Sequence, residues 1–270
     1  MERSLIVIRG GGDLATGVAV RLHRSGFDVV VLEIQQPLAV RRGVAFAEAV
    51  YSGEIEVEGV RGVFLADARQ ISQIRSEGAV PVIVDPDVNL IEDVELSALV
   101  DGRMRKAPPE ENLASHLFTI GLGPGFTAGV NCQAVIETNR GHSMGRVIWE
   151  GSAEADTKIP SAVVGYDVTR VLRAPLSGIL DGGLKIGAMV KAGEEVVRIG
   201  GVPVEAPFDG VLRGLVHDGL HVDEAMKIGD LDPRGESSYC FSISDKALAV
   251  GGGVLEALLS QPRFRRALSG

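Results

Sequence analysis

The start of the chain alternates between β-strand and α-helix patterns around a glycine-rich turn. An apolar strand is expected over 4–9, and the sequence Gly-Gly-Gly-Asp-Leu-Ala follows at 10–15. A helix is expected over 18–24, and a second apolar strand over 28–32 ends at Glu33. This order is typical of a βαβ unit whose turn, of the form G-x-G-x-x-A, binds the phosphates of a dinucleotide. It constrains the chain to an α/β fold with parallel strands.

The glycine turn predicts where a phosphate group would bind. Without Cβ atoms, the backbone N–H groups of residues 10–12 can approach a pyrophosphate, and the helix N-terminus offers further donors. Asp13 is expected to cap this helix. Glu33 lies 23 residues after Gly10, where an acid accepts the ribose hydroxyls of NAD rather than a 2′-phosphate. A turn that only packs a strand against a helix, with no ligand, is the alternative.

The α/β alternation continues to about residue 165. Helices are expected over 66–76 and 89–100, and strands over 80–85, 117–120 and 134–137. Such alternation predicts a Rossmann-like, doubly wound parallel sheet for residues 1–165. Ligands of these sheets bind at the carboxyl ends of the strands, so the glycine-rich loop after the fourth strand joins the site. The predicted cofactor-binding residues are Gly10, Gly11, Gly12, Asp13, Leu14, Glu33, Gly121, Gly123 and Gly125.

Polar side chains gather after that loop, beside apolar strands. Cys132, Glu137 and His142 are the candidates for catalysis, and Asp85 is a further candidate for the acid or base that a dehydrogenase needs. A reactive thiol must be exposed and have a lowered pKa, so buried packing is the alternative for Cys132. Cys240 lies in an apolar segment that is expected to be a core strand. The sequence predicts no metal site.

An internal repeat occupies residues 166–233. The sequence Arg-Ala-Pro-Leu-Ser-Gly-Ile-Leu at 173–180 recurs as Glu-Ala-Pro-Phe-Asp-Gly-Val-Leu at 205–212, an offset of 32 residues. Each half is a set of short strands that is too small to bury its own apolar face, so the two halves are expected to interlock in one β sandwich. This pattern resembles the barrel-sandwich hybrid of biotinyl and lipoyl carrier domains.

The sequence Glu-Ala-Met-Lys at 224–227 is similar to the biotin-accepting signature of those carrier domains. Their lysine occupies the hairpin that joins the two halves, whereas the corresponding junction here, at 199–204, contains no lysine. Lys227 is therefore expected to be a solvated loop lysine, and neither biotin nor lipoyl attachment is predicted.

The tail, residues 234–270, is expected to pack on the first domain as a strand and a helix. That helix is expected to start at Val254 and to end before Pro262. The three glycines at 251–253 precede it. They offer either an anion site at the helix N-terminus or close packing of the tail.

The charge and hydropathy of the chain argue against nucleic acid as a partner and against a membrane-spanning helix. A net charge of −9 over 270 residues disfavours nucleic acid, which needs clustered Lys and Arg. No apolar run approaches the roughly 18 residues that a membrane helix requires. The two cysteines form no CxxC motif and suit a reducing compartment. A soluble, cytoplasmic protein is expected, and a homo-oligomer is left open.

Several stretches of the chain are similar to a single family. They are residues 7–17, Glu33 with Pro37, Arg41 and Arg42, and residues 121–129, 137–142, 173–175 and 244–253. On these stretches the chain resembles the YqeB family of selenium-dependent molybdenum hydroxylase accessory proteins. The resemblance implies a role in the maturation of hydroxylases that carry labile selenium. Its implied partners are a client molybdenum hydroxylase or cofactor-assembly proteins.

Two functions remain open at this point, and the family resemblance favours the first. The first is a maturation factor that binds NAD, another nucleotide or molybdopterin cytosine dinucleotide in the glycine crevice and docks a client through the repeat domain. In that role Cys132 would transfer selenium or sulfur to a cofactor. The second is an NAD-dependent oxidoreductase of unknown substrate. A scaffold that has lost its ligand is a third reading, and whether any reaction is catalysed stays open.

Overall fold

The chain divides into two compact units. The computed structural model describes residues 4–89, 96–109, 117–156, 163, 165 and 168–268. Unit 1 comprises residues 1–37, 45–157 and 243–270, and unit 2 comprises residues 38–44 and 158–242. Unit 2 thus takes in a short segment near residue 40, and the part of the tail before residue 243 groups with it.

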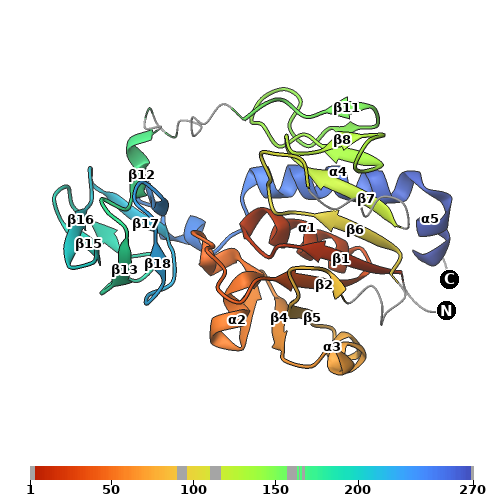
Figure 1. Ribbon diagram of the computed structural model, residues 1–270, viewed down its shortest axis with the longest axis horizontal. Coiled ribbons are helices and arrows are strands. Elements are labelled where there is room, and N and C mark those ends of the chain that lie inside the picture. The colour runs from red at the N-terminus through yellow and green to blue at the C-terminus, as the bar shows by residue number, and fades with distance from the viewer. Residues whose placement is uncertain are drawn as a thin grey trace. The chain divides into compact units, whose positions relative to one another are not determined.

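Unit 1 is built on a nine-stranded sheet (Figure 1). Across the sheet the strands are β10 (Val147–Ile148), β9 (Ala134–Ile136), β7 (Phe118–Leu122), β6 (Ala98–Asp101), β1 (Leu5–Arg9), β2 (Asp28–Glu33), β5 (Val80–Val84), β4 (Val60–Leu65) and β3 (Glu54–Val57). The strands from β9 to β4 are parallel, and the two edge strands are antiparallel to their neighbours. The order reverses at β1, which has β2 on one side and β6 on the other.

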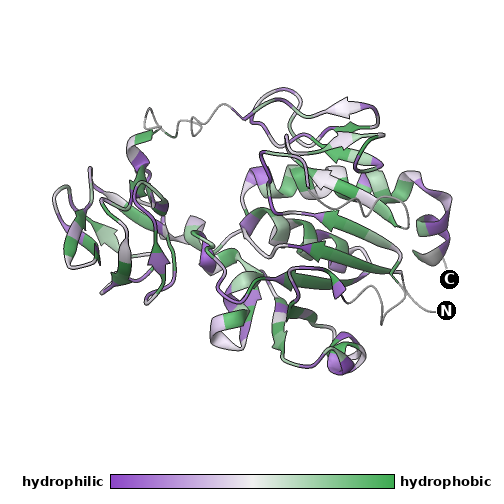
Figure 2. Ribbon diagram, in the orientation of Figure 1, coloured by the Kyte–Doolittle hydropathy of each residue, from purple (hydrophilic) through white to green (hydrophobic). Residues whose placement is uncertain are grey.

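The α/β class predicted from the sequence is confirmed, and burial explains why these strands form. Every residue of β1 and the four central residues of β2 are buried, as expected for parallel strands covered on both faces. Figure 2 shows the apolar character of these strands. A separate two-stranded sheet pairs β8 (Thr127–Ala128) with β11 (Gly151–Ser152).

Two helices of unit 1, α1 (Asp13–Arg24) and α4 (Asp245–Ser260), pack against each other. A Cβ atom on Gly17 would lie 2.7 Å from the Cβ of Ala247, and one on Gly251 would lie 3.2 Å from the carbonyl oxygen of Gly17 and 3.4 Å from Val18. Residues later in α1 contact residues later in α4, so the two helices run parallel. Both N-termini therefore lie at the carboxyl edge of the sheet. The remaining helices are α2 (Ala49–Ser52), α3 (Ile71–Ser76) and α5 (Pro262–Leu268).

The tail helix differs from the prediction. It begins at Asp245 rather than Val254, because the Ser244 hydroxyl accepts a hydrogen bond from the N–H of Ala247 at 3.2 Å and caps it. Residues 251–253 therefore lie inside α4, where they allow close packing and are not at a helix N-terminus.

The prediction of a helix over 89–100 is also wrong at its C-terminal end, because strand β6 begins at Ala98. Residues 90–95 of that prediction lie outside the described residues. All four residues of β6 are buried, and a short, wholly buried strand gives the same apolar run as a buried helix. The hairpin of β3 and β4 was not predicted either.

Unit 2 contains two four-stranded antiparallel sheets. The first has the order β12 (Val171–Arg173), β19 (Lys227–Asp232), β17 (Gly210–Leu215) and β14 (Met189–Val190), and the second has the order β16 (Val202–Glu205), β15 (Glu195–Ile199), β13 (Gly178–Asp181) and β18 (His221–Val222). Adding the 32-residue offset to β12, β13, β14 and β15 gives the positions of β16, β17, β18 and β19, respectively. When each strand is exchanged for its repeat partner, the strand order of the first sheet becomes that of the second. Each sheet therefore takes two strands from each half of the repeat.

The repeated positions form the core between these sheets. Leu180, Val190, Val196 and Ile199 are buried in the same cluster as the residues 32 positions later, which are Leu212, Val222, Ile228 and Leu231. The repeat thus encodes a shared core.

Lys227 is not the solvated loop lysine that was predicted. It is the first residue of β19, its side chain is 41% exposed, and its Nζ lies 3.8 Å from an Asp230 carboxylate oxygen. The hairpin that joins the two halves turns at Gly200 and Gly201, both with positive φ.

In the part of the chain that the structure covers, no helix has the length and apolar character needed to cross a membrane.

Candidate functional site

The three glycines after β1 have different surroundings. Gly10 has a φ of 91°, which favours glycine. A Cβ on Gly11 would lie 2.8 Å from the backbone nitrogen of Ala47, whose N–H donates to the Gly11 carbonyl at 2.9 Å. Gly11 therefore serves close packing. Around a Cβ on Gly12 nothing lies within 4 Å, so this position faces open space.

Helix α1 begins directly behind this open position. Its N-cap residue is Gly12, and no side chain caps it by a hydrogen bond. Asp13 is the first helical residue, so the prediction that it caps the helix is wrong. Leu14 follows it in the half-buried first turn. The positive end of the α1 dipole thus reaches the carboxyl edge of the sheet beside Gly12.

Glu33 is held next to the same turn by β2. One carboxylate oxygen accepts the N–H of Gly11 at 2.6 Å, and the other accepts the N–H of Ile34 at 2.8 Å. Burial raises the pKa of Glu33, while the two N–H donors act to lower it. Each carboxylate oxygen can accept a further hydrogen bond. The structure therefore brings together the acid and the glycine turn that were singled out from the sequence.

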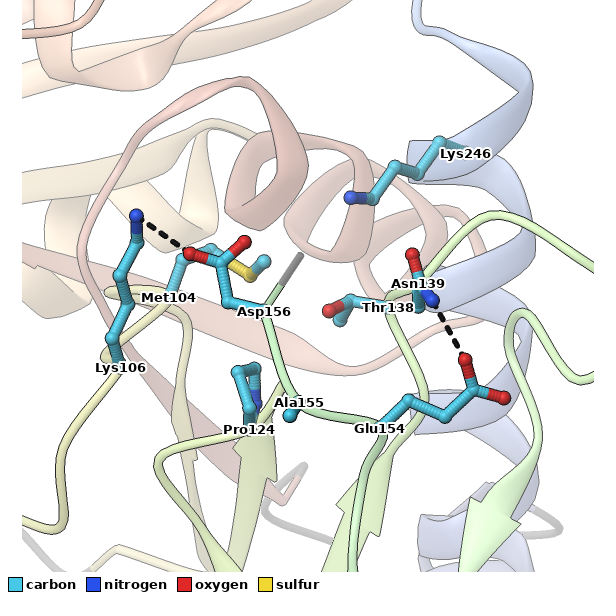
Figure 3. Close-up of a pocket in the computed structure, with 9 residues that line it drawn as sticks. All are labelled: Met104, Lys106, Pro124, Thr138, Asn139, Glu154, Ala155, Asp156 and Lys246. Atoms are coloured by element: carbon cyan, nitrogen blue, oxygen red, sulfur yellow. Dashed lines mark hydrogen bonds and ion pairs between the residues drawn. The ribbon is translucent and has the colours of Figure 1, made fainter. Parts of the chain in front are cut away.

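A cavity of about 160 Å³ lies at the carboxyl ends of β6, β7 and β9 (Figure 3). Its lining residues come from the loops after these strands, the segment after β11 and the first turn of α4. They are Met104, Lys106, Pro124, Thr138, Asn139, Glu154, Ala155, Asp156 and Lys246. Met104 has a φ of 56°, a left-handed conformation that costs energy for a residue with a side chain.

The two carboxylates that line the cavity already have partners. The Lys106 ammonium lies 2.7 Å from Asp156, and the Asn139 amide donates to Glu154 at 2.6 Å. Figure 3 shows these pairs at opposite sides of the cavity.

Lys246 differs from these residues. Its side chain is half-buried and reaches from α4 into the cavity (Figure 3), and its ammonium makes no hydrogen bond or ion pair with the residues that the structure describes. Burial lowers the pKa of Lys246, and the positive charge of Arg140 lowers it further. The carboxylates of Asp13, Glu137 and Asp156 act in the opposite direction.

Lys246 was not predicted from the sequence as a site residue. One signal was available: a lysine in the first turn of a helix opposes the helix dipole, which favours acids there. Its neighbour Asp245 is instead paired with Arg140, at 2.6 and 2.7 Å.

The predicted acid and base residues do not line the cavity. Glu137 is only 2% exposed, and its two carboxylate oxygens accept the N–H groups of Asn139 at 2.7 Å and Glu154 at 2.8 Å. It therefore positions the two loops that form one wall. His142 is exposed on a loop, and Asp85 accepts hydrogen bonds from Asn89.

The glycines of the loop after β7 serve packing. A Cβ on Gly121 would overlap the buried Phe126 ring, and one on Gly125 would lie 2.6 Å from the carbonyl oxygen of Arg105. Gly123 has a φ of 86°, and a Cβ there would lie 3.0 Å from the Thr138 hydroxyl. The loop contributes Pro124 to the cavity.

Both thiols are buried. Cys132 is 2% exposed and Cys240 is 0% exposed, and Cys240 ends a short 3-10 turn rather than lying in the predicted strand. Burial raises the pKa of Cys132 to about 11 and also raises that of Cys240. Because the thiolate is the nucleophile, this environment argues against a reactive Cys132.

We expect neither thiol of the folded protein to react appreciably with iodoacetamide at neutral pH. A pKa of about 11 leaves on the order of 1 in 10,000 Cys132 side chains as thiolate at pH 7. Intact-mass measurements over time, with a urea-unfolded sample as the control, check this. Rapid alkylation of Cys132 alone in the folded sample would contradict it.

Comparison with known proteins places the chain beside one curated relative. The uncharacterized protein YqeB of Escherichia coli (strain K12) is 46% identical over 259 residues, which is 94% of this chain and 47% of that protein. The chain thus spans about half the length of the relative. This identity supports the resemblance to the YqeB family. No protein-family model matches the chain.

Two solved structures show only distant similarity. One is an aspartoacylase family protein from Mesorhizobium loti, with 12% identity, a TM-score of 0.28 and coverage of 86% of this chain and 85% of that chain. The other is the ectoine utilization protein EutE (DoeB) from Ruegeria pomeroyi, with 9% identity, a TM-score of 0.26 and coverage of 85% of both chains. At these TM-scores neither structure informs the fold or function of this chain.

Proposed function

We propose that this chain is a YqeB-family accessory protein that binds a nucleotide at the carboxyl edge of a Rossmann-like sheet. In this proposal it takes part in the maturation of selenium-dependent molybdenum hydroxylases. The ligand is a dinucleotide such as NAD or molybdopterin cytosine dinucleotide. Unit 2, proposed to be a barrel-sandwich module, docks the client hydroxylase or a cofactor-assembly protein.

The observation that carries the nucleotide site is the reversal of strand order at β1. Ligands of open α/β sheets bind where the order reverses, outside the carboxyl ends of the strands. At this point the chain places open space beside Gly12 and the uncapped N-terminus of α1. A phosphate group there would accept hydrogen bonds from backbone N–H groups and interact favourably with the helix dipole.

Glu33 supports the same proposal. It lies at the end of β2, against Gly11, and its carboxylate can accept the hydroxyls of an unphosphorylated ribose. The maturation role rests on the family resemblance. For the alternative, an NAD-dependent oxidoreductase, the structure gives no specific support, because Glu137 is bound to two backbone N–H groups, Asp85 accepts from Asn89, and His142 is exposed on a loop.

We expect Glu33→Gln to weaken nucleotide binding about 10- to 150-fold, the equivalent of about 1.5–3 kcal/mol for hydrogen bonds to a charged group. A thermal-shift panel of NAD, NADP, ATP, CTP and molybdopterin cytosine dinucleotide first identifies the ligand, because a ligand that binds the native state raises its stability. Titration calorimetry then compares the wild type with the variant.

Glu54→Gln is the matched control, since Glu54 is an exposed glutamate of β3. It should bind the nucleotide as the wild type does. Equal affinity of the Glu33 variant and the wild type would place the nucleotide elsewhere. If no nucleotide shifts the melting midpoint, the nucleotide function is wrong.

A further inference from the structure

One ammonium at the cavity, that of Lys246, makes no hydrogen bond or ion pair with a described residue, while the carboxylates of Glu154 and Glu137 keep their negative charge because their partners are neutral. Asp156 is paired with Lys106, Glu154 accepts from Asn139, Asp245 is paired with Arg140, and Glu137 accepts two backbone N–H groups. Lys246 has no such partner among the described residues. A half-buried ammonium without an acceptor costs free energy that a bound acceptor would recover.

A second unpartnered donor faces the same cavity. Thr138 is only 3% exposed and lines the cavity, yet its hydroxyl makes no hydrogen bond within the part of the chain that the structure describes. In Figure 3 the Thr138 hydroxyl and the Lys246 ammonium both reach into the space beside Asp156. The hydroxyl borders the cavity and is available to donate a hydrogen bond to an acceptor on a ligand there.

Helix α4 adds positive potential at this place. Because α1 and α4 run parallel, both N-termini lie at the carboxyl edge of the sheet. Lys246 belongs to the first turn of α4, and α1 has no side-chain cap. Of the two helices, only α4 contributes a lining residue among those described, so the positive end of its dipole and the Lys246 ammonium favour an anion in the cavity, whereas the Glu154 and Asp156 carboxylates of the same lining oppose one.

We propose that the cavity binds the phosphoryl group of an organic phosphate, with the Lys246 ammonium and the Thr138 hydroxyl donating to its oxygens. Its volume of about 160 Å³ leaves room for a phosphoryl group and a few attached atoms. This phosphoryl site is inferred from the donors that line the cavity, and it does not require a nucleoside bound at Glu33. The phosphoryl group belongs either to a nucleotide or to another phosphate ester.

Titration calorimetry of the full chain with inorganic pyrophosphate tests the proposal. The wild type should bind, and Lys246→Met should weaken binding about 10- to 150-fold, the range for hydrogen bonds to charged groups. Thr138→Val should weaken it about 2- to 10-fold, the range for neutral ones. Lys246→Arg keeps the charge and should bind more tightly than Lys246→Met.

The control is Lys191→Met, which removes the same charge from an exposed lysine that pairs with Asp209 in unit 2. It should bind pyrophosphate as the wild type does. The melting midpoint of free Lys246→Met should equal or exceed that of the wild type, which shows that this variant folds. Unchanged affinity in Lys246→Met, or no binding by the wild type, would overturn the proposal.

Two further arms separate this site from the proposed nucleotide function. If pyrophosphate binding depends on Lys246 while no nucleotide binds, the phosphoryl site stands and the nucleotide function fails. If a nucleotide binds in a manner that depends on Glu33 but not on Lys246, the nucleotide function stands and the phosphoryl site is wrong.

Discussion

Replacement of Gly253 by alanine is expected to destabilise unit 1 by about 2 kcal/mol. A Cβ at this position in α4 would overlap the carbonyl oxygen of Gly145 and lie 3.0 Å from the Ile136 side chain. Gly145 has a φ of 82°, and a Cβ there would lie 2.7 Å from the carbonyl oxygen of Ala249, so the two backbones meet directly. Overpacking costs about 1–3 kcal/mol, and a Cβ this close to a backbone oxygen should cost about 3 kcal/mol, of which the better helix propensity of alanine returns about 1 kcal/mol.

The neighbouring glycine of the same helix is the matched control. A Cβ on Gly252 would have Arg21 as its nearest neighbour, at 4.0 Å. Gly252→Ala should therefore stabilise the protein by about 0.5–1 kcal/mol, through helix propensity alone. Urea unfolding followed by circular dichroism measures both variants. Equal effects of the two substitutions would show that α4 does not pack closely on the segment around Gly145.

Glu137→Ala is expected to destabilise the protein by about 3 kcal/mol, because two N–H groups lose a charged acceptor in a largely buried place. The carboxylate joins the loop that starts at Thr138 to the segment that starts at Glu154. Glu137→Gln keeps one oxygen acceptor and should cost about half as much. Urea unfolding gives both values.

Glu150→Ala serves as the control for this substitution, since Glu150 is exposed. It should leave the free energy of unfolding within about 0.5 kcal/mol of the wild type. Wild-type stability of Glu137→Ala would show that these N–H groups find other acceptors and that Glu137 is free for a different role.

Local patterns predicted the opening βαβ unit well. Close packing requires small residues there, because a Cβ on Gly102 would lie 2.8 Å from the Cβ of Ala15. The order of strand, glycines, helix and acid also brought Glu33 to Gly11. By contrast, β6 was missed because four residues buried on all sides carry no periodicity that separates strand from helix.

The cavity could not be read from the sequence. Its walls come from the loops after three strands, from the segment after β11, and from a helix that begins more than 100 residues beyond those loops. Only the tertiary structure brings them together. Glu137 and His142 were predicted as site residues because polar residues cluster around them in the sequence. In the structure Glu137 holds two loops together, and His142 is exposed. The repeat was more informative, since its matched apolar positions lie in the core of unit 2.

The exchange of strands between the two repeat halves has a consequence for how unit 2 can be taken apart. Neither half of the repeat forms a complete sheet. Removal of one half would therefore remove two of the four strands from each sheet. The core would lose its matched residues from both sheets in the same event. We therefore expect unit 2 to fold and unfold as a single unit, although its sequence consists of two similar halves.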